Sequence, residues 1–371
     1  MSRESLLRAT LRLHLADGVG AVLLRRLIRR FGDAENAVAA GAIGWRKVAG
    51  IGEKTVEAMA AVTDADVDAE LAEADRHNAR VLLLEDAEYP EALKNIHAPP
   101  QVLYVRGRLE LTDAVALGVV GSRRCTHYGM EQAERFGRML ARAGFTVVSG
   151  GARGIDAAAH RGALSGEGRT VAVMGCGLST LYPPDNAELF ERIIASDAGA
   201  LVSELPMRTA VLSGNFPTRN RIIAGMSLGV LVVEAAARSG ALITAEEADE
   251  EGRAVFAVPG RADSPMSRGV NELIRDGAVL VQDLDDILEH LGEVGAKMTP
   301  DEEPPAEVIP TGLDETETAL HSALADGPMA LDELVRKTGL DSGRAASAMT
   351  MLVLKGAIEQ RPGNVFARRK R

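Results

Sequence analysis

The sequence has 371 residues, of which 46% are apolar, enough for two or three domains with buried cores. No apolar run approaches the ~20 residues that a membrane-spanning helix needs, and the first residues lack the pattern of a secretory signal peptide. We therefore expect a cytoplasmic protein without membrane contacts. The net charge of −11 argues against a generally basic nucleic-acid binder, so any DNA site must be a local basic groove.

Residues 1–65 are predicted to form a domain of short helices, and this part of the chain is net basic. Residues 18–20 and 50–52 each place an apolar residue between two glycines just before a helix. This pattern is typical of helix–hairpin–helix or SAM-like domains, where glycine lets the backbone approach a phosphate and the next helix offers free N–H groups. It also fits a small helical bundle that uses glycine only to turn tightly.

Residues 66–291 are predicted to form an α/β domain. Short apolar runs alternate with helical segments, and several runs are apolar on both faces, as parallel strands covered by helices are. This alternation predicts an extended Rossmann-like fold with a doubly wound, mostly parallel sheet. The predicted strands lie within residues 80–85, 101–107, 115–121, 145–151, 170–177, 200–204, 229–235, 254–260 and 278–283.

The rest of the chain divides in two. Residues 292–310 lack periodicity and carry proline and acidic residues, which indicates a flexible linker. Residues 311–371 contain three helical patterns followed by a hairpin around Pro362-Gly363-Asn364, and this order predicts a winged-helix domain. Winged helices commonly bind DNA and also commonly serve as protein-contact modules.

Glycine gathers where the predicted strands of the α/β domain end. Ser122 and Arg123 follow one strand, while Gly150, Gly151 and Arg153 follow another. In an open parallel sheet, ligands bind outside the carboxyl ends of the strands, and glycines there let main-chain N–H groups reach an anion. The arginines add charge-assisted donors that suit phosphate. We predict a phosphate-binding crevice, the alternative being that the glycines only permit strand-to-helix turns.

A second basic element precedes an apolar helix that is predicted to begin near Ile222. Its candidate contacts are Phe216, Arg219, Asn220 and Arg221. Aromatic faces stack on unpaired bases while arginine holds the backbone. Phe216 equally fits an aromatic of the core or of a hinge.

Patterns typical of enzymes are weaker. Asp156 and His160 are four residues apart, as metal ligands can be, but no third ligand follows from the sequence, which favours a capping Asp and a packed or hydrogen-bonded His. Glu234 follows a buried strand and is expected to accept hydrogen bonds from loop N–H groups rather than act as a base. The sequence contains no nucleophile elbow and no phosphate loop of the ATPase type. We therefore predict no metal and no cofactor.

Eight segments of the α/β domain occur in the order and spacing of the DprA/Smf (DNA processing A) family. They lie at residues 119–129, 147–164, 171–186, 203–206, 215–227, 232–245, 257–260 and 269–278. The chain resembles this family over essentially the whole of residues 80–290. The resemblance implies an extended Rossmann-like fold, homodimers formed through that domain, and binding of single-stranded DNA at the strand ends. It further implies that the protein brings the recombinase RecA onto incoming strands during natural transformation, displacing or sharing them with single-strand-binding protein, without enzymatic turnover.

The resemblance also implies roles for residues at matching positions. Ser122 and Arg123 should hold a phosphate, and the main-chain N–H groups of residues 150–152 should contact the strand, the last of them from Ala152. Phe216, Arg219 and Asn220 should complete the pocket, and Arg268 is a further candidate.

Two other functions compete with this interpretation. One is a nucleotide-hydrolysing enzyme of the phosphoribohydrolase type, although residues 232–248 lack the glycine-rich loop of those enzymes. The other is a transcription regulator acting through the winged helix. That hypothesis leaves the crevice unexplained, and the expected recognition helix at residues 342–356 is not markedly basic.

Overall fold

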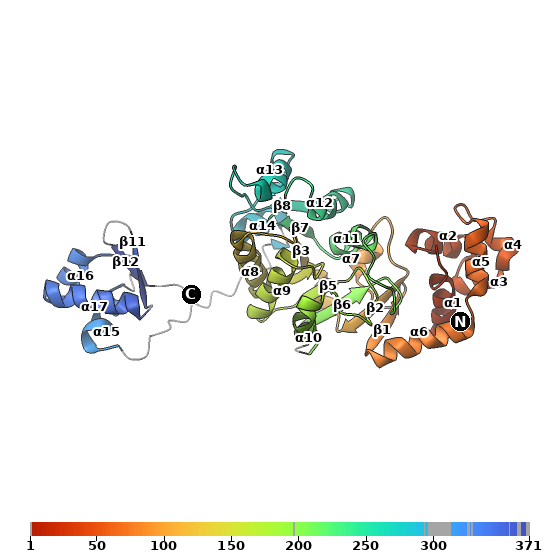
Figure 1. The fold of residues 1–371 in the computed structure, drawn as a ribbon, viewed down its shortest axis with the longest axis horizontal. Coiled ribbons are helices and arrows are strands. Elements are labelled where there is room, and N and C mark those ends of the chain that lie inside the picture. The colour runs from red at the N-terminus through yellow and green to blue at the C-terminus, as the bar shows by residue number, and fades with distance from the viewer. Residues whose placement is uncertain are drawn as a thin grey trace. The chain divides into compact units, whose positions relative to one another are not determined.

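The architecture is that of a computed structural model, which describes residues 2–195, 197–292, 294–295, 313–324, 327, 329–355, 357–361 and 365–368. The chain divides into two compact units, Met1–Asp301 and Glu302–Arg371, which Figure 1 shows. The boundaries predicted at residues 65, 291 and 310 stay predictions. Among the described helices, none is long and apolar enough to cross a membrane.

The first unit opens with short helices. They are α1 (Arg3–His14), α2 (Ala21–Phe31), α3 (Ala34–Ala39), α4 (Gly41–Trp45), α5 (Glu53–Ala61) and α6 (Asp64–Arg76). Gly18 and Gly50 take φ values of 80° and 91°, which only glycine adopts freely. The turn at Gly18 faces α5, because a Cβ on Gly18 would lie 3.7 Å from Thr55 Oγ1. The turn at Gly50 faces α2, because a Cβ on Gly50 would lie 3.0 Å from Leu23 Cδ2. Phosphate binding by these turns stays a prediction.

A nine-stranded sheet forms the centre of the first unit, in the order β1-β2-β6-β5-β4-β3-β7-β8-β9. The strands from β6 to β9 in this order pair in parallel, whereas β1 with β2 and β2 with β6 are antiparallel. Each predicted run overlaps one strand, which confirms the doubly wound, mostly parallel sheet. The strands are β1 (Ala79–Leu83), β2 (Val102–Gly107), β3 (Ala116–Val120), β4 (Thr146–Ser149), β5 (Thr170–Val173), β6 (Gly199–Ser203), β7 (Gly229–Val232), β8 (Ala254–Ala257) and β9 (Val279–Leu280).

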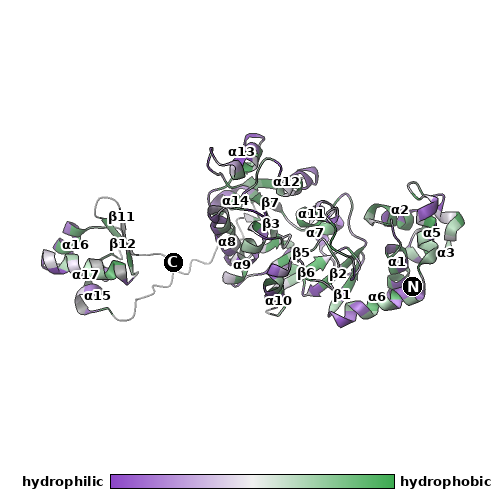
Figure 2. Ribbon diagram, viewed as in Figure 1, coloured by the Kyte–Doolittle hydropathy of each residue, from purple (hydrophilic) through white to green (hydrophobic). Residues whose placement is uncertain are grey.

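Helices cover both faces of this sheet. They are α7 (Glu91–Lys94), α8 (His127–Arg142), α9 (Ile155–Ser165), α10 (Ala187–Ala195), α11 (Asn215–Gly225), α12 (Gly240–Glu250), α13 (Arg268–Arg275) and α14 (Leu284–Leu291). Side chains alternate between the faces: Val147 belongs to the hydrophobic cluster that includes residues of α8, α9 and α14, and Val148 to the cluster that includes residues of α7, α11, α12 and α13. The central strands are accordingly mostly hydrophobic in Figure 2, whereas the helices combine hydrophobic and hydrophilic residues.

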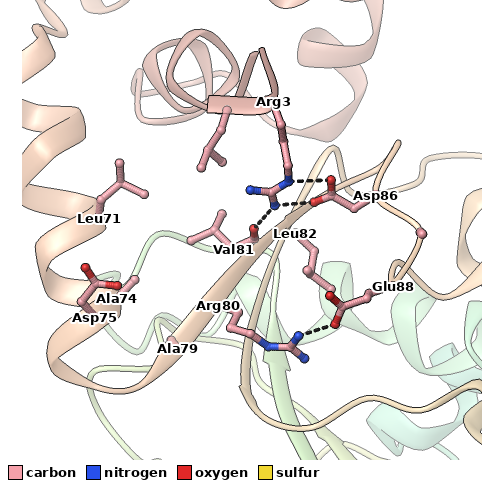
Figure 3. Close-up of a pocket in the computed structure, with 12 residues that line it drawn as sticks. Arg3, Leu71, Ala74, Asp75, Ala79, Arg80, Val81, Leu82, Asp86 and Glu88 are labelled. Atoms are coloured by element: carbon pink, nitrogen blue, oxygen red, sulfur yellow. Dashed lines mark hydrogen bonds and ion pairs between the residues drawn. The ribbon is translucent and has the colours of Figure 1, made fainter. Parts of the chain in front are cut away.

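The N-terminal helices dock on the antiparallel edge of the sheet. Figure 3 shows Arg3 of α1 donating to both carboxylate oxygens of Asp86, at 2.8 and 2.6 Å, and to the carbonyl of Val81 in β1 at 3.1 Å. Glu73 of α6 accepts hydrogen bonds from Arg208 Nη2 at 2.6 Å and from Ser179 Oγ at 3.0 Å. The Arg208 hydrogen bond is the main reason that the pKa of Glu73 falls to about 2. Helix α6 thereby fixes the segments that follow β5 and β6.

The second unit contains a winged helix. Its elements are α15 (Glu315–Ala323), β10 (Met329–Ala330), α16 (Leu331–Thr338), α17 (Ser342–Leu354), β11 (Ile358–Arg361) and β12 (Val365–Arg368), with the strands in the order β10-β12-β11. Leu320, Leu334 and Leu352 form its core with Phe366. This arrangement confirms the predicted fold. The hairpin turn at residues 362–364 and most of the predicted linker at 292–310 lie outside the described residues.

A buried ion pair joins the beginnings of three central strands. Arg169, just before β5, donates to Asp113 Oδ1 and Oδ2 at 2.7 and 2.9 Å. Thr146 Oγ1 in β4 and the N–H of Glu110 each donate to the same carboxylate at 2.7 Å. The Asp113 side chain is only 5% exposed, so its charge is balanced within the protein and not by water.

We predict that Asp113→Ala lowers the free energy of unfolding by about 3 kcal/mol, the lower end for a broken buried ion pair, because the largely buried Arg169 then keeps only Glu110, at 3.5 Å, as a carboxylate partner. Urea denaturation of the full chain measures the change. Asp263→Ala is the matched control, since Asp263 pairs with Arg261 while both side chains are more than 70% exposed, and its cost should stay below about 1 kcal/mol. Equal costs in the two variants would contradict the prediction.

Candidate nucleic-acid interface

The candidate site lies where the order of the strands reverses. From β3 the chain adds β4, β5 and β6 on one side, and then returns to place β7 directly against β3 on the other side. At such a reversal the loops after neighbouring strands leave in opposite directions and open a crevice. The loops after β3, β4, β5 and β7 therefore surround one region at the carboxyl edge of the sheet (Figure 1).

Glu234, just after β7, holds the loop that follows β3. Its main-chain oxygen accepts a hydrogen bond from Ser122 N at 2.7 Å. Its carboxylate accepts from Thr126 N at 2.7 Å and from Thr126 Oγ1 at 2.8 Å. Glu234 is buried, and these hydrogen bonds confirm it as an acceptor for loop N–H groups.

The glycine loops pack closely against this region. Gly154 has a φ of 79°, and a Cβ there would lie 2.4 Å from Ser122 O, so this glycine is needed for the turn itself. A Cβ on Gly150 would lie 2.5 Å from the terminal nitrogens of Arg219 and 2.6 Å from Asp156 Oδ2. The N–H of Ala152 donates to Asp156 Oδ2 at 3.3 Å. The first turn of α9 thus already uses this N–H, and a contact from Ala152 to a strand stays a prediction.

Arg219 lies beneath these loops as a buried cation. It is 5% exposed; its Nη1 donates to the carbonyl of Val173, and its Nε is buried with no partner among the described residues. Burial is the main cause that lowers the pKa of Arg219 to about 10. Burial likewise raises the pKa of Asp156, against the nearby charge of Arg219. The two side chains form no ion pair within 4 Å among the described residues.

His160 packs beside the same cluster. Its Nδ1 lies 2.7 Å from Thr170 Oγ1, and that hydroxyl donates to Val147 O at 2.7 Å. Because the hydroxyl proton is used by Val147, the oxygen accepts from His160 Nδ1–H, which leaves Nε2 as a buried group without a partner among the described residues. Asp156 and His160 thus contact different partners, and no cluster of metal-binding side chains occurs in the part of the chain that the structure describes.

Aromatic rings and a cation meet at the rim of the crevice. The guanidinium carbon of Arg123 lies 4.9 Å from the centre of the Phe216 ring. Arg123 is exposed, and no carboxylate pairs with it among the described residues. Tyr182, from the loop after β5, places its ring centre 6.1 Å from that of Phe216 at an angle of 42°. Phe216 is half-buried against Gly175, so it belongs to the rim and not to the core.

Residues 182–186 carry contacts that the sequence analysis missed. The side chain of Asn186 is buried and donates to Gly151 O at 2.9 Å and to Ala152 O at 3.2 Å. Asp185 pairs with Arg153 at the surface. These contacts fix the glycine loop against the loop after β5. The segment Tyr182-Pro183-Pro184-Asp185-Asn186 was a signal in the sequence, but its partners come from a different loop.

Two expectations for residues 215–221 need correction. The helix starts at Asn215, not near Ile222, because Pro217 lies in its first turn, where no intrahelical N–H is needed. Arg219, Asn220 and Arg221 are accordingly part of α11, and all three are buried. Arg221 Nη2 pairs with Glu204 Oε2 at 2.5 Å, and Asn220 Nδ2 donates to Gly240 O at 3.4 Å. Arg221 is thus committed to an internal ion pair and is not available to a phosphate.

Arg268 lies apart from the loops after β3 and β4. It is 74% exposed at the start of α13, with its Nε 3.5 Å from Glu272 Oε1. The next residue, Gly269, donates its N–H to Ala235 O at 2.8 Å, beside the loop after β7. The structure therefore places Arg268 on the β7 side of the crevice, opposite Phe216 and Tyr182.

The sequence itself agrees with one family along most of its length. The model of the family described as DNA recombination-mediator protein A matches residues 80–292, and that of the DprA winged helix domain matches residues 302–364. The chain belongs to the DprA family. Protein Smf of Synechocystis sp. is 36% identical over 95% of this chain and 96% of its own length.

Solved DprA structures share the fold. DprA from Streptococcus pneumoniae, 33% identical, matches with a TM-score of 0.66 over 76% of this chain and 97% of its own. DprA from Helicobacter pylori, 29% identical, matches with a TM-score of 0.51 over 57% of this chain and 95% of its own. The latter structure concerns that protein's single-stranded DNA binding mode. The resemblance seen in the sequence motifs is confirmed.

We predict that His160 makes this DprA-family chain less stable in acid. Burial lowers the pKa of His160 from 6.5 to about 3, so between these values the unfolded chain binds a proton that the folded chain does not. Stability is therefore lost as the pH falls below 6.5, and His160 should account for about 2 kcal/mol of the loss between pH 7 and pH 5. Urea denaturation at both pH values measures it. His160→Gln should show a loss smaller by that amount, and identical losses would refute the assignment.

Proposed function

We propose that this chain binds single-stranded DNA in the crevice at the carboxyl ends of β3, β4 and β5. The observation that carries the proposal is Arg123, an exposed cation without a carboxylate partner among the described residues, placed over the ring of Phe216. Alternating basic and aromatic groups are what single-strand sites use, because stacking tolerates any base while arginine holds the backbone. The family and the H. pylori relative's DNA binding mode support the same ligand.

The roles follow from the geometry. Ser122 and Arg123, which Glu234 holds in place, take a phosphate. The main-chain N–H groups of Gly150 and Gly151 approach the strand, and Arg219 contributes positive charge from below. Phe216 and Tyr182 face the bases. Arg153 and Arg268 lie at the surface around this centre, where they steer the strand. Asn220 is buried beside it and supports the pocket through its hydrogen bond to Gly240 O.

We further propose that the bound strand is passed to the recombinase RecA. The family is described as a recombination mediator, and a mediator of natural transformation must place the recombinase on a strand that single-strand-binding protein also covers. Such a protein acts in the cytoplasm and without turnover of its own. The proposal includes a homodimer formed through the α/β domain, for which the edge strand β9, with Leu280 44% exposed, is the open end of the sheet.

We expect Arg123→Ala to weaken binding of a short labelled oligo-dT, and the double variant Arg123→Ala/Arg219→Ala to weaken it at least tenfold. Each lost phosphate contact should also reduce the slope of log affinity against log salt by about 0.7. Fluorescence anisotropy across a salt series measures both quantities.

Arg142→Ala is the matched control, because Arg142 is an exposed arginine at the end of α8, on the opposite edge of the sheet. Its affinity and slope should equal those of the unchanged protein. If the folded Arg123 variant binds as tightly as the control, the crevice is not the site. Preference for a duplex that disappears on deleting residues 311–371 would assign DNA binding to the winged helix.

We expect the full chain to shorten the lag before RecA assembles on a strand precoated with single-strand-binding protein. The lag can be followed through the ATPase activity of RecA, because that activity requires the assembled filament. Arg123→Ala should restore most of the lag, whereas Arg142→Ala should not. If the unchanged protein does not shorten the lag, the mediator function is contradicted, but the proposed DNA binding is not.

A further inference from the structure

Tyr182 extends the rim of the crevice by a second ring. Along the rim lie the guanidinium of Arg123, the ring of Phe216 at 4.9 Å, and the ring of Tyr182 a further 6.1 Å away. The row therefore holds one cation followed by two aromatic rings.

The Tyr182 ring is held in place before any ligand arrives. It is half-buried, and the residues just after it are fixed by Asp185 on Arg153 and by Asn186 on the carbonyls of Gly151 and Ala152. Within the described residues its hydroxyl has no hydrogen bond, so the phenol is not needed for an internal contact. A ring that is already fixed loses little entropy when a ligand stacks on it.

The two rings are spaced for an unstacked strand. Successive bases of a B-form strand rise by about 3.4 Å, so stacked neighbours cannot reach ring centres that are 6.1 Å apart and inclined by 42°. Bases that have been pulled apart can do so. We propose that Tyr182 is a second base-stacking residue, which takes the base next to the one at Phe216 and so favours a single strand over a duplex. This inference rests on the proposed DNA binding in the crevice.

The test compares two ligands on the full chain: a short labelled oligo-dT and an abasic strand of the same length, which has the phosphates but no bases. Tyr182→Ala should bind oligo-dT roughly five- to a hundredfold more weakly, the range typical for one stacked base. It should bind the abasic strand as the unchanged protein does, and the salt slope should not change because no phosphate contact is lost. Tyr182→Phe should retain the affinity for oligo-dT.

Tyr182→Trp supplies a second measurement that does not depend on the Ala variant folding. Its indole fluorescence should be quenched by oligo-dT and not by the abasic strand, while Trp45 is buried among the N-terminal helices and serves as the unresponsive background.

Equal weakening on both strands would overturn the stacking role and make Tyr182 a structural support. Unchanged oligo-dT affinity in Tyr182→Ala would also overturn it. Failure of the proposed DNA binding would give a different result. The unchanged protein would then bind neither strand, or Arg123→Ala would leave the affinity for oligo-dT unchanged.

Discussion

The hydrogen bonds of Glu234 determine the shape of the crevice. They connect the end of β7 to the loop after β3, across the reversal in strand order that separates the two halves of the sheet. Without them, the two loops would leave the sheet independently. The main-chain oxygen of Glu234 holds Ser122 and its buried carboxylate holds Thr126, so the loop is held at two points. Arg123, between those points, is directed over Phe216 and toward the open side.

The crevice has two arginines, Arg123 and Arg219, without an ion pair among the described residues, although the chain as a whole carries −11. At physiological ionic strength charges are screened beyond about 8 Å, so a bound strand responds mainly to the groups that line the site. Among the groups that line the site, Arg219 contributes a buried positive charge. Its burial lowers the pKa only to about 10, well above neutral pH, so it stays charged, and its Nε has no partner among the described residues. An anion above it would interact with a charge that Asp156 offsets only from a distance, without an ion pair among the described residues.

Much of the fold could be predicted because it depends on local pattern. The nine apolar runs became strands, and glycines such as Gly150 and Gly154 marked the carboxyl edge of the sheet, where we place the DNA site. Side-chain partners could not be predicted, because they join distant segments: Arg221 looked like a phosphate ligand until Glu204, at the end of β6, was seen to pair with it. Tyr182 was missed for the same reason. Only its contact with Phe216, more than thirty positions later in the sequence, sets it in the crevice.

In the proposed site, the contact between Arg123 and Phe216 also limits how tightly a strand can bind. In the free protein the guanidinium covers the ring, and a contact of this kind at an exposed site is worth about 0.5–1 kcal/mol. A strand that engages both groups must break that contact before its phosphate holds the arginine and its base covers the ring. The binding free energy is therefore the difference between the new contacts with the strand and the lost contact between Arg123 and Phe216. This favours a strand that can offer a phosphate and an unstacked base together, which a duplex cannot do without melting.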